Sequence, residues 1–147
     1  FALALFFNKA PTIFEDGRQV RDFVNIKDVV AANCLVLENP DADFQVFNVG
    51  GGQAWTVNAF YDAMQAVAGK QIEPVVSGYY RFGDTRHIFS DTARLQALGW
   101  QATRRVPSSI EAYWSYLNRQ QDMEDVLAYA QKHMQQLNVI RKTGKPA

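Results

Sequence analysis

The sequence has little that points to secretion, membrane insertion or binding to a charged polymer. Its one cysteine, Cys34, cannot form an internal disulfide, which fits a reducing compartment. Fifteen basic side chains balance fifteen acidic ones, so no net charge attracts nucleic acid or an anionic membrane. The opening apolar run, residues 1–7, is far shorter than the ~20 residues that a membrane-spanning helix needs. We therefore expect a cytoplasmic protein with no nucleic-acid or membrane partner.

Residue patterns for metal binding and nucleophilic catalysis are also lacking. Neither His87 nor His133 has metal-ligand spacing with another His, Cys or Asp residue, so we expect no metal site. Residue order supports no Ser/His/Asp or Cys/His arrangement. Cys34 falls within an apolar helical stretch, where a buried and inert thiol is the expected state.

What is present fits one folded domain. Of its 147 residues, 48% are hydrophobic and 20% are charged, as in soluble globular proteins. Strand-like and helix-like segments alternate, which predicts an α/β architecture. The expected strands are residues 11–14, 21–26, 45–49 and 72–76, and residues 87–89 are expected to be an extended piece. The expected helices are residues 1–7, 28–38, 56–69, 91–98, 107–117 and 122–137, the first being the end of a buried helix that begins upstream.

Two helices allow more detailed predictions. Asp28 is expected to cap the second helix. The buried side of that helix should consist of Val29, Val30, Ala32, Leu35 and Val36. The last helix carries an apolar stripe at three- and four-residue steps. That stripe consists of Met123, Val126, Ala130, Met134 and Leu137. Residues 141–147 are polar and are predicted to be frayed.

Three consecutive glycines, Gly50, Gly51 and Gly52, stand between an expected strand and an expected helix. This order resembles a turn that binds phosphate through its backbone amides. A dinucleotide fingerprint needs a further glycine at position 55, where the helix packs on the strand, and Trp55 stands there. We therefore expect a tight turn with exposed amides and no complete NAD site.

Arg21 and Arg81 stand among apolar and aromatic residues, where a guanidinium group needs an anionic partner. The forked donors of arginine suit a diphosphate. The alternative is a structural ion pair, either Arg21 with Asp22 or Asp28, or Arg81 with Asp84. These residues taken alone favour the ion pairs, because structural pairs are commoner than ligand sites.

Four segments resemble, in order, motifs of the nucleotide-sugar epimerases and dehydratases of the extended short-chain dehydrogenase/reductase family. Residues 16–29 resemble the Asp-Gly-x-Gln-x-Arg-Asp-Phe-Val-x-Val-x-Asp-Val signature, and residues 47–52 the Tyr/Phe-Asn-x-Gly-x-Gly strand and turn. Residues 81–87 resemble the Arg-Pro-Gly-Asp-x-Arg-His loop, and residues 91–100 the segment that ends in Leu-Gly-Trp. The resemblance covers residues 1–117, and four ordered motifs are far more specific than one.

The resemblance implies a small mixed α/β substrate lobe that lacks the N-terminal, dinucleotide-binding Rossmann half. In this family the lobe binds a nucleoside-diphosphate sugar and presents the sugar to NAD. Arg21 and Arg81 would hold the diphosphate, Asn48 would hydrogen-bond nearby, and Asp84 would orient Arg81 or meet a ribose hydroxyl. The full set of substrate-binding residues implied by the match is Arg21, Asn48, Arg81, Asp84, Pro11, Ile13 and Phe14, the last three lining the nucleoside pocket. Asp22 and Asp28 are expected to be structural.

The redox chemistry of the family also needs a tyrosine followed four residues later by lysine, and none of the six tyrosines here has that partner. The resemblance thus implies no catalytic residue and no NAD bound by this chain alone. Whether the chain belongs to an active enzyme stays open at this point.

The chain departs from the family pattern in two places. Phe82 replaces the proline of the Arg-Pro-Gly-Asp loop, and residues 118–147 form a helical extension and polar tail beyond the lobe of residues 1–117. The expected function is nucleotide-sugar binding within an epimerase or dehydratase, closest to deoxysugar 4-epimerases. The alternative is a non-catalytic binding or assembly module, with a Rossmann half or a second copy docked on exposed apolar surface. A third alternative is a reductase of a non-nucleotide substrate. Such an enzyme would have no need for Arg21, Asn48 and Arg81 together.

Overall fold

The computed structural model describes residues 1–142, in which helices carry most of the regular structure. The helices are α1 (Ala2–Phe6), α2 (Ile26–Glu38), the 3₁₀ helix η1 (Pro40–Ala42), α3 (Val57–Ala68), α4 (Ala93–Ala97), α5 (Val106–Leu117) and α6 (Leu127–Gln136). The strands are β1 (Thr12–Ile13), β2 (Val20–Asp22), β3 (Ala54–Thr56), β4 (Val75–Val76), β5 (Tyr79–Arg81) and β6 (Ile140–Lys142).

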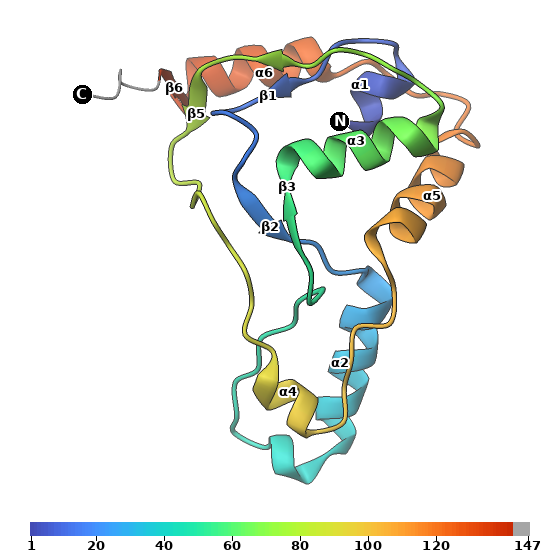
Figure 1. Cartoon of the computed structure of the whole chain (residues 1–147), viewed down its shortest axis with the longest axis vertical. Coiled ribbons are helices and arrows are strands. Elements are labelled where there is room, and N and C mark those ends of the chain that lie inside the picture. Colours follow the sequence, from blue (N-terminus) through green and yellow to red (C-terminus); the bar gives the residue numbers. More distant parts are fainter. Residues whose placement is uncertain (143–147) are drawn as a thin grey trace.

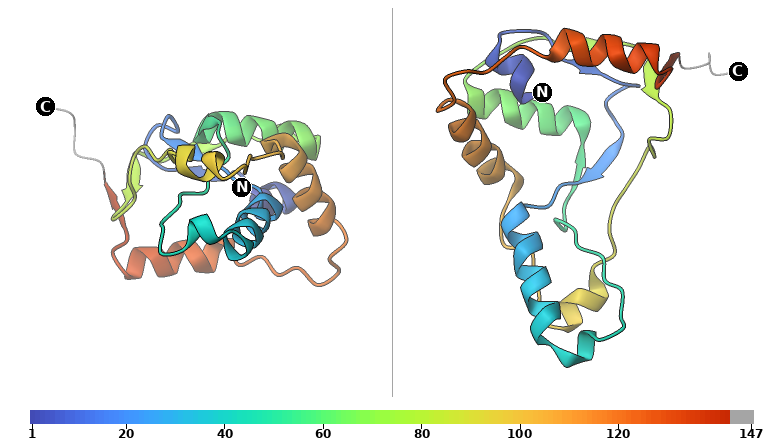
Figure 2. Two further views of the ribbon diagram at one scale, coloured as in Figure 1. Left: turned by 90° about the horizontal axis from the view of Figure 1, so that it is seen from below. Right: turned by 180° about the vertical axis from the view of Figure 1, so that it is seen from behind.

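The strands of the described chain pair two by two. β1 runs parallel to β4, β2 antiparallel to β3, and β5 antiparallel to β6. The prediction of a mixed α/β fold is confirmed. The chain forms a wide upper part that contains α1, α3, α6, β1 and β5, and a narrow lower part that contains α2, η1 and α4 (Figure 1). We call these parts the body and the stalk, and the view from behind shows the same division (Figure 2).

Each part has its own apolar cluster. In the body, Leu5, Ile13, Tyr61 and Leu117 are almost fully buried and belong to one cluster. The Tyr61 hydroxyl donates a hydrogen bond of 2.6 Å to the Ile72 carbonyl, which satisfies the polar end of this side chain. The smaller cluster of the stalk is built on Ala32, Leu95 and Trp100. Most of the apolar burial therefore lies in the body.

The start of α2 differs from the prediction. Asn25 caps the helix, because its side-chain oxygen accepts a hydrogen bond of 2.9 Å from the Lys27 N–H. Asp28 lies one turn further on with only 2% of its surface exposed. Its carboxylate accepts hydrogen bonds from the hydroxyl and N–H of Thr103 and from the N–H and guanidinium of Arg104. The predicted cap at Asp28 is wrong, whereas its expected structural role is confirmed.

The environment of Asp28 acts on its acidity in two directions. Burial on its own raises the pKa of a carboxyl group, but the hydrogen bonds from Arg104 and Thr103, together with the Arg104 charge, hold the pKa of Asp28 below its ordinary value. Asp28 is therefore ionised near neutral pH and ties α2 to the segment that leads into α5.

Two predicted buried positions of α2 lie at the surface. Val30 is 52% exposed, and the Cys34 thiol is exposed rather than buried. The stalk is narrow, and only Asp28 and Ala32 of this helix are buried. The expectation of a wide apolar face assumed a core on one whole side of the helix, which the stalk does not provide.

One expected strand is absent from the described chain, and one predicted frayed segment is partly ordered. Residues 45–49 form no strand, because no described segment pairs with them as a sheet neighbour. Residues 87–89, expected to be an extended piece, lie beside β2, where the Ile88 N–H donates a hydrogen bond of 3.1 Å to the Val20 carbonyl. Arg141 and Lys142 belong to β6, which corrects the expected fraying at these two positions. The rest of that prediction, residues 143–147, falls outside the described residues.

Candidate functional site

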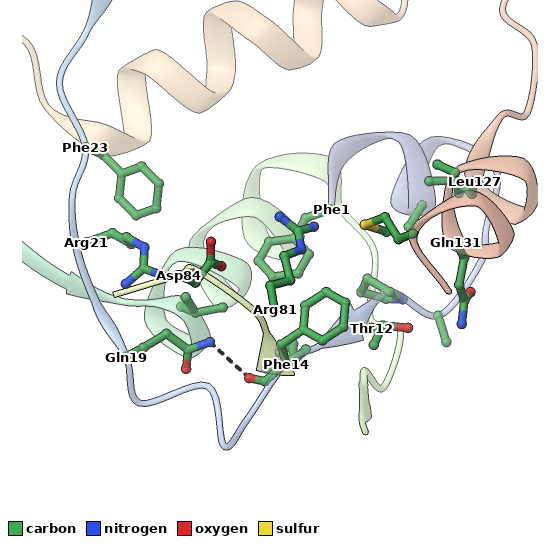
Figure 3. Close-up of a pocket in the computed structure, with 17 residues that line it drawn as sticks. Phe1, Thr12, Phe14, Gln19, Arg21, Phe23, Arg81, Asp84, Leu127 and Gln131 are labelled. Carbon is green, nitrogen blue, oxygen red and sulfur yellow. Dashed lines mark hydrogen bonds and ion pairs between the residues drawn. The ribbon is translucent and has the colours of Figure 1, made fainter. Parts of the chain in front are cut away.

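A hollow of about 520 Å³ opens between β1, β2, β5 and α6. This volume falls in the range of small-molecule sites, roughly 300–1,000 Å³. Its lining includes Pro11, Thr12, Ile13, Phe14, Gln19, Arg21, Phe23, Arg81, Asp84, Leu127, Ala130, Gln131 and Met134. Figure 3 shows Arg21 and Asp84 towards one side of the hollow, Arg81 and Phe14 in the middle, and Leu127 and Gln131 towards the other side.

Arg21 is fixed by the backbone around it. One terminal nitrogen of its guanidinium, Nη1, donates hydrogen bonds of 2.9 Å to the carbonyls of Val20 and Arg86. The other, Nη2, lies 4.0 Å from the nearest carboxylate oxygen of Asp84. The expected pairs with Asp22 and Asp28 are not formed, because Asp22 accepts from backbone amides and Asp28 pairs with Arg104. Among the described residues, Asp84 is therefore the one carboxylate within ion-pair distance of Arg21.

Arg81 lies on the ring of Phe14, with its central guanidinium carbon 5.0 Å from the ring centroid. Within the described residues this guanidinium forms no ion pair, so the expected pair with Asp84 is absent as well. The negatively polarised face of the ring attracts the guanidinium without a carboxylate partner. The two arginines therefore bring two positive charges to one hollow with one carboxylate nearby.

The loop after β5 is held by Arg86. Its guanidinium forms ion pairs with Glu15 and Asp16, in the turn between β1 and β2. The hydrogen bond from Arg86, with a second from the Arg18 N–H, lowers the pKa of Asp16 below its ordinary value. Since the Arg86 carbonyl also accepts from Arg21, this loop and β2 are positioned together.

Asn48 lies away from the hollow. Its side-chain nitrogen donates a hydrogen bond of 3.1 Å to the Asp91 carbonyl, just before α4 in the stalk. Six of the seven residues implied by the sequence, Pro11, Ile13, Phe14, Arg21, Arg81 and Asp84, line the hollow. The expected convergence of Arg21, Asn48 and Arg81 is therefore seen for the two arginines and not for Asn48.

Gln19 is a residue of the hollow that the sequence reasoning missed. It is only 6% exposed, its side-chain nitrogen donates a hydrogen bond of 2.9 Å to the Phe14 carbonyl, and its side-chain oxygen has no partner. A buried oxygen without a donor is costly, so it marks a position where a ligand donor is stabilising. Gln19 and Arg21 stand two residues apart, and that spacing places them on the same side of an extended strand.

The glycine turn has a structural explanation. The Gly51 N–H donates a hydrogen bond of 2.7 Å to the Asp22 carboxylate, which also accepts from the Ser90 N–H at 3.1 Å. A side chain at position 50 would collide with this carboxylate, and one at position 51 with the Phe23 carbonyl. The expectation of freely exposed amides is thus wrong for Gly51, whose donor is already used by an anion of the chain itself.

Other kinds of site find no support in the described chain. No group of His, Cys, Asp and Glu residues within positions 1–142 is arranged to hold a metal ion. Over the same residues, none of the helices has the length and apolar character that crossing a bilayer needs.

Comparison with known proteins shows which families and structures this chain is similar to. Residues 3–50 match the profile of the NAD dependent epimerase/dehydratase family. A putative UDP-glucose 4-epimerase of Methanocaldococcus jannaschii is 33% identical over 94 residues, which cover 64% of this chain and 30% of that protein. The dTDP-L-rhamnose 4-epimerase of Burkholderia thailandensis is 36% identical over 94 residues, 63% of this chain and 26% of that protein. The crystal structure of UDP-glucose 4-epimerase with UDP-glucose from Thermotoga maritima superposes with a TM-score of 0.74 at 31% identity, over 80% of this chain and 38% of that chain.

The chain belongs to the NAD-dependent epimerase/dehydratase family. It spans about a third or less of the curated relatives above, and the fold corresponds to the substrate lobe of this extended short-chain dehydrogenase/reductase family. The family uses NAD, but the glycine turn of this chain does not fit the dinucleotide fingerprint. Gly51 is engaged by Asp22 and Trp55 occupies the packing position, so we derive no step through NAD from this chain.

Proposed function

We propose that the hollow of this epimerase/dehydratase family member binds the nucleoside-diphosphate part of a nucleotide sugar. The observation that carries the proposal is the pair of arginines, Arg21 and Arg81, at one hollow, where the carboxylate of Asp84 lies 4.0 Å from Arg21 and forms no ion pair with Arg81. Support comes from the Thermotoga maritima relative, whose structure contains UDP-glucose, and from the curated relatives named as nucleotide-sugar 4-epimerases.

The donors of the arginines suit a diphosphate. Arg21 uses Nη1 for two backbone carbonyls and keeps Nη2 and Nε for a bidentate contact with phosphate oxygens. Arg81 supplies a second forked cation from the face of Phe14. Asp84, beside Arg21, can accept from a ribose hydroxyl, and the Gln19 oxygen can accept a further hydrogen bond.

The remaining wall suits a nucleoside. Pro11, Ile13 and Phe14 offer apolar surface next to the charged residues. A ligand with an anionic middle and a flat, weakly polar end therefore matches the distribution of charge.

We further propose that the parent reaction is 4-epimerisation of a deoxysugar nucleotide, which the 36% identity to the dTDP-L-rhamnose 4-epimerase supports. No tyrosine of this chain has the required lysine, so proton transfer would need residues supplied by another part of the protein.

Calorimetric titration of the chain with UDP, dTDP, GDP and ADP tests the proposal. Arg21→Ala and Arg81→Ala should each weaken binding about 10- to 100-fold, because a hydrogen bond to a charged group contributes about 1.5–3 kcal/mol. Arg119→Ala, which removes an exposed arginine outside the hollow, should bind as the unaltered chain does. A folded chain that binds none of the four nucleotides would refute the proposal.

A second candidate function is that of an assembly module, in which the lobe docks on a Rossmann half or on a second copy. The stalk favours this role, because several of its large apolar side chains are at least half exposed. They are Ile26, Val30, Leu37, Phe44 and Val46. Such surface tends to mark protein contacts.

A further inference from the structure

The segment of residues 118–142, which we call the C-terminal segment, forms part of the hollow although it lies beyond the family resemblance. Leu127, Ala130, Gln131 and Met134 of α6 all line the hollow. Their spacing of three, one and three residues places them on one face of the helix. Figure 1 shows α6 running across the top of the body next to β1. Of the apolar stripe predicted for a helix over residues 122–137, Ala130 and Met134 lie on α6 and line the hollow. The helix begins later than predicted, so Met123 and Val126 precede it, and Leu137 follows its last residue.

Both ends of the C-terminal segment are fastened to the body. Ahead of α6, Asp125 forms an ion pair with Lys9 and accepts a hydrogen bond of 3.2 Å from the Leu127 N–H. After α6, β6 pairs with β5, the strand that carries Arg81, and Ile140 stands opposite Arg81 in the register. The segment therefore spans the hollow from the loop before β1 to the strand of a proposed ligand residue.

Phe82 supplies two of the contacts at the second attachment. Its N–H donates a hydrogen bond of 2.7 Å to the Val139 carbonyl, and its ring lies 3.6 Å from the central guanidinium carbon of Arg141. Proline, which the family pattern has at this position, could form neither contact, since it has no N–H and no aromatic face. The two departures from the family pattern, Phe82 and the C-terminal segment, thus contact each other.

We propose that the C-terminal segment is a specificity wall of the nucleotide site, which selects among nucleosides and is held in place by the contact between Phe82 and Arg141. This inference rests on the proposed function. The wall presents apolar carbon and one amide to the hollow and no charge, so it suits the uncharged base or ribose and not the phosphates. The Gln131 amide both donates and accepts, which allows it to distinguish one base edge from another.

The test compares nucleotides with inorganic pyrophosphate, which has the charge and lacks the nucleoside. Met134→Ala should weaken the preferred nucleoside diphosphate about 3- to 10-fold, as expected for one to two lost methylene contacts. Gln131→Ala should change the affinity ratio between UDP and ADP by a similar factor, about 3- to 10-fold, because one neutral hydrogen bond is lost. Pyrophosphate affinity should change less than about 2-fold in both variants. Tyr129→Ala is the matched control, because this side chain of α6 is 71% exposed and does not line the hollow.

The attachment is tested at Phe82. Phe82→Pro removes the donor and the ring together and should reproduce the loss of nucleoside discrimination, whereas Phe82→Tyr keeps both and should not. Arg141→Ala should weaken nucleotide binding about 2- to 5-fold, in line with an exposed cation–π contact.

The outcomes separate the two proposals. If the unaltered chain binds nucleoside diphosphates and the α6 and Phe82 variants match it and the Tyr129 control, the specificity wall is refuted and the nucleotide site stands. If the folded, unaltered chain binds no nucleotide, the site itself is refuted. Circular dichroism checks each variant for folding, and Gln131→Ala, an exposed substitution, decides the question if a more buried one fails to fold.

Discussion

Close contacts of single residues explain the glycine turn and give the first prediction. Gly51→Ala should destabilise the chain by about 2 kcal/mol or more, because the added carbon collides with the Phe23 carbonyl. Gly52→Ala meets open space, and its positive φ of 72° should cost only about 1 kcal/mol. Urea unfolding of the two variants measures both values. Equal stabilities would show that the turn is less constrained than the structure indicates.

The unpartnered oxygen of Gln19 gives a second prediction at this scale. Gln19→Glu replaces the donor to the Phe14 carbonyl with an oxygen and places a carboxylate beside the proposed diphosphate site. Nucleotide affinity should fall about 10-fold or more, since one hydrogen bond is lost and like charges face each other. Gln101→Glu, an exposed exchange of the same kind, is the control in the same titration. Unchanged affinity in Gln19→Glu would remove this residue from the site.

Among the elements, α2 depends on the ionised Asp28. A carboxyl group whose pKa is lowered in the folded state adds stability above its unfolded pKa, near 3.9, and this stability is lost as pH falls through the lower, folded value. The free energy of unfolding should therefore fall between pH 6 and pH 3, and less steeply in Asp28→Asn than in the unaltered chain. Asp16 and Asp125, whose pKa values are also lowered, leave a remaining slope. Urea unfolding at both pH values measures the difference, and identical slopes would contradict this role.

At pH 7, Asp28→Ala should cost about 2–3 kcal/mol, because the hydrogen bonds from Thr103 and Arg104 are lost together. The Arg104 guanidinium is 42% exposed and can be hydrated, which keeps the cost below that of an isolated buried charge. Chemical unfolding followed by tryptophan fluorescence gives the value. A change below about 0.5 kcal/mol, the usual range of a surface substitution, would contradict it.

The elements also show what a sequence can predict. α3 was predicted from Thr56 to Gly69, and it forms with Thr56 as its cap and Gly69 in the left-handed conformation, because both signals are local. A strand needs a partner that the sequence does not identify, so the pattern of residues 45–49 predicts a strand although these residues form none.

In the site, the family motifs indicate Arg21, Arg81 and Asp84. Gln19 and the wall formed by α6 depend on tertiary contacts that no motif records.

For the molecule as a whole, the exposed apolar side chains of the stalk predict self-association or a partner. In sedimentation velocity, the chain should show concentration-dependent association that Leu37→Lys combined with Val46→Lys reduces, since both side chains are more than three-quarters exposed. Tyr129→Lys, an exposed change on α6, is the matched control. A monomer at all concentrations would argue against the assembly module and leave the nucleotide site untouched.

The extended segment at residues 46–49 has a practical consequence for the isolated chain. Its backbone amides and carbonyls form no backbone hydrogen bond with other described residues, and the exposed side chains of Val46 and of the nearby Phe44 add apolar surface. An extended segment with unpaired backbone groups, like the edge of a sheet, can pair with a strand from a neighbouring molecule. Concentrated samples should thus be prone to fibre growth that begins at this segment, with a cross-β signal that thioflavin T detects, and Phe47→Pro should suppress it.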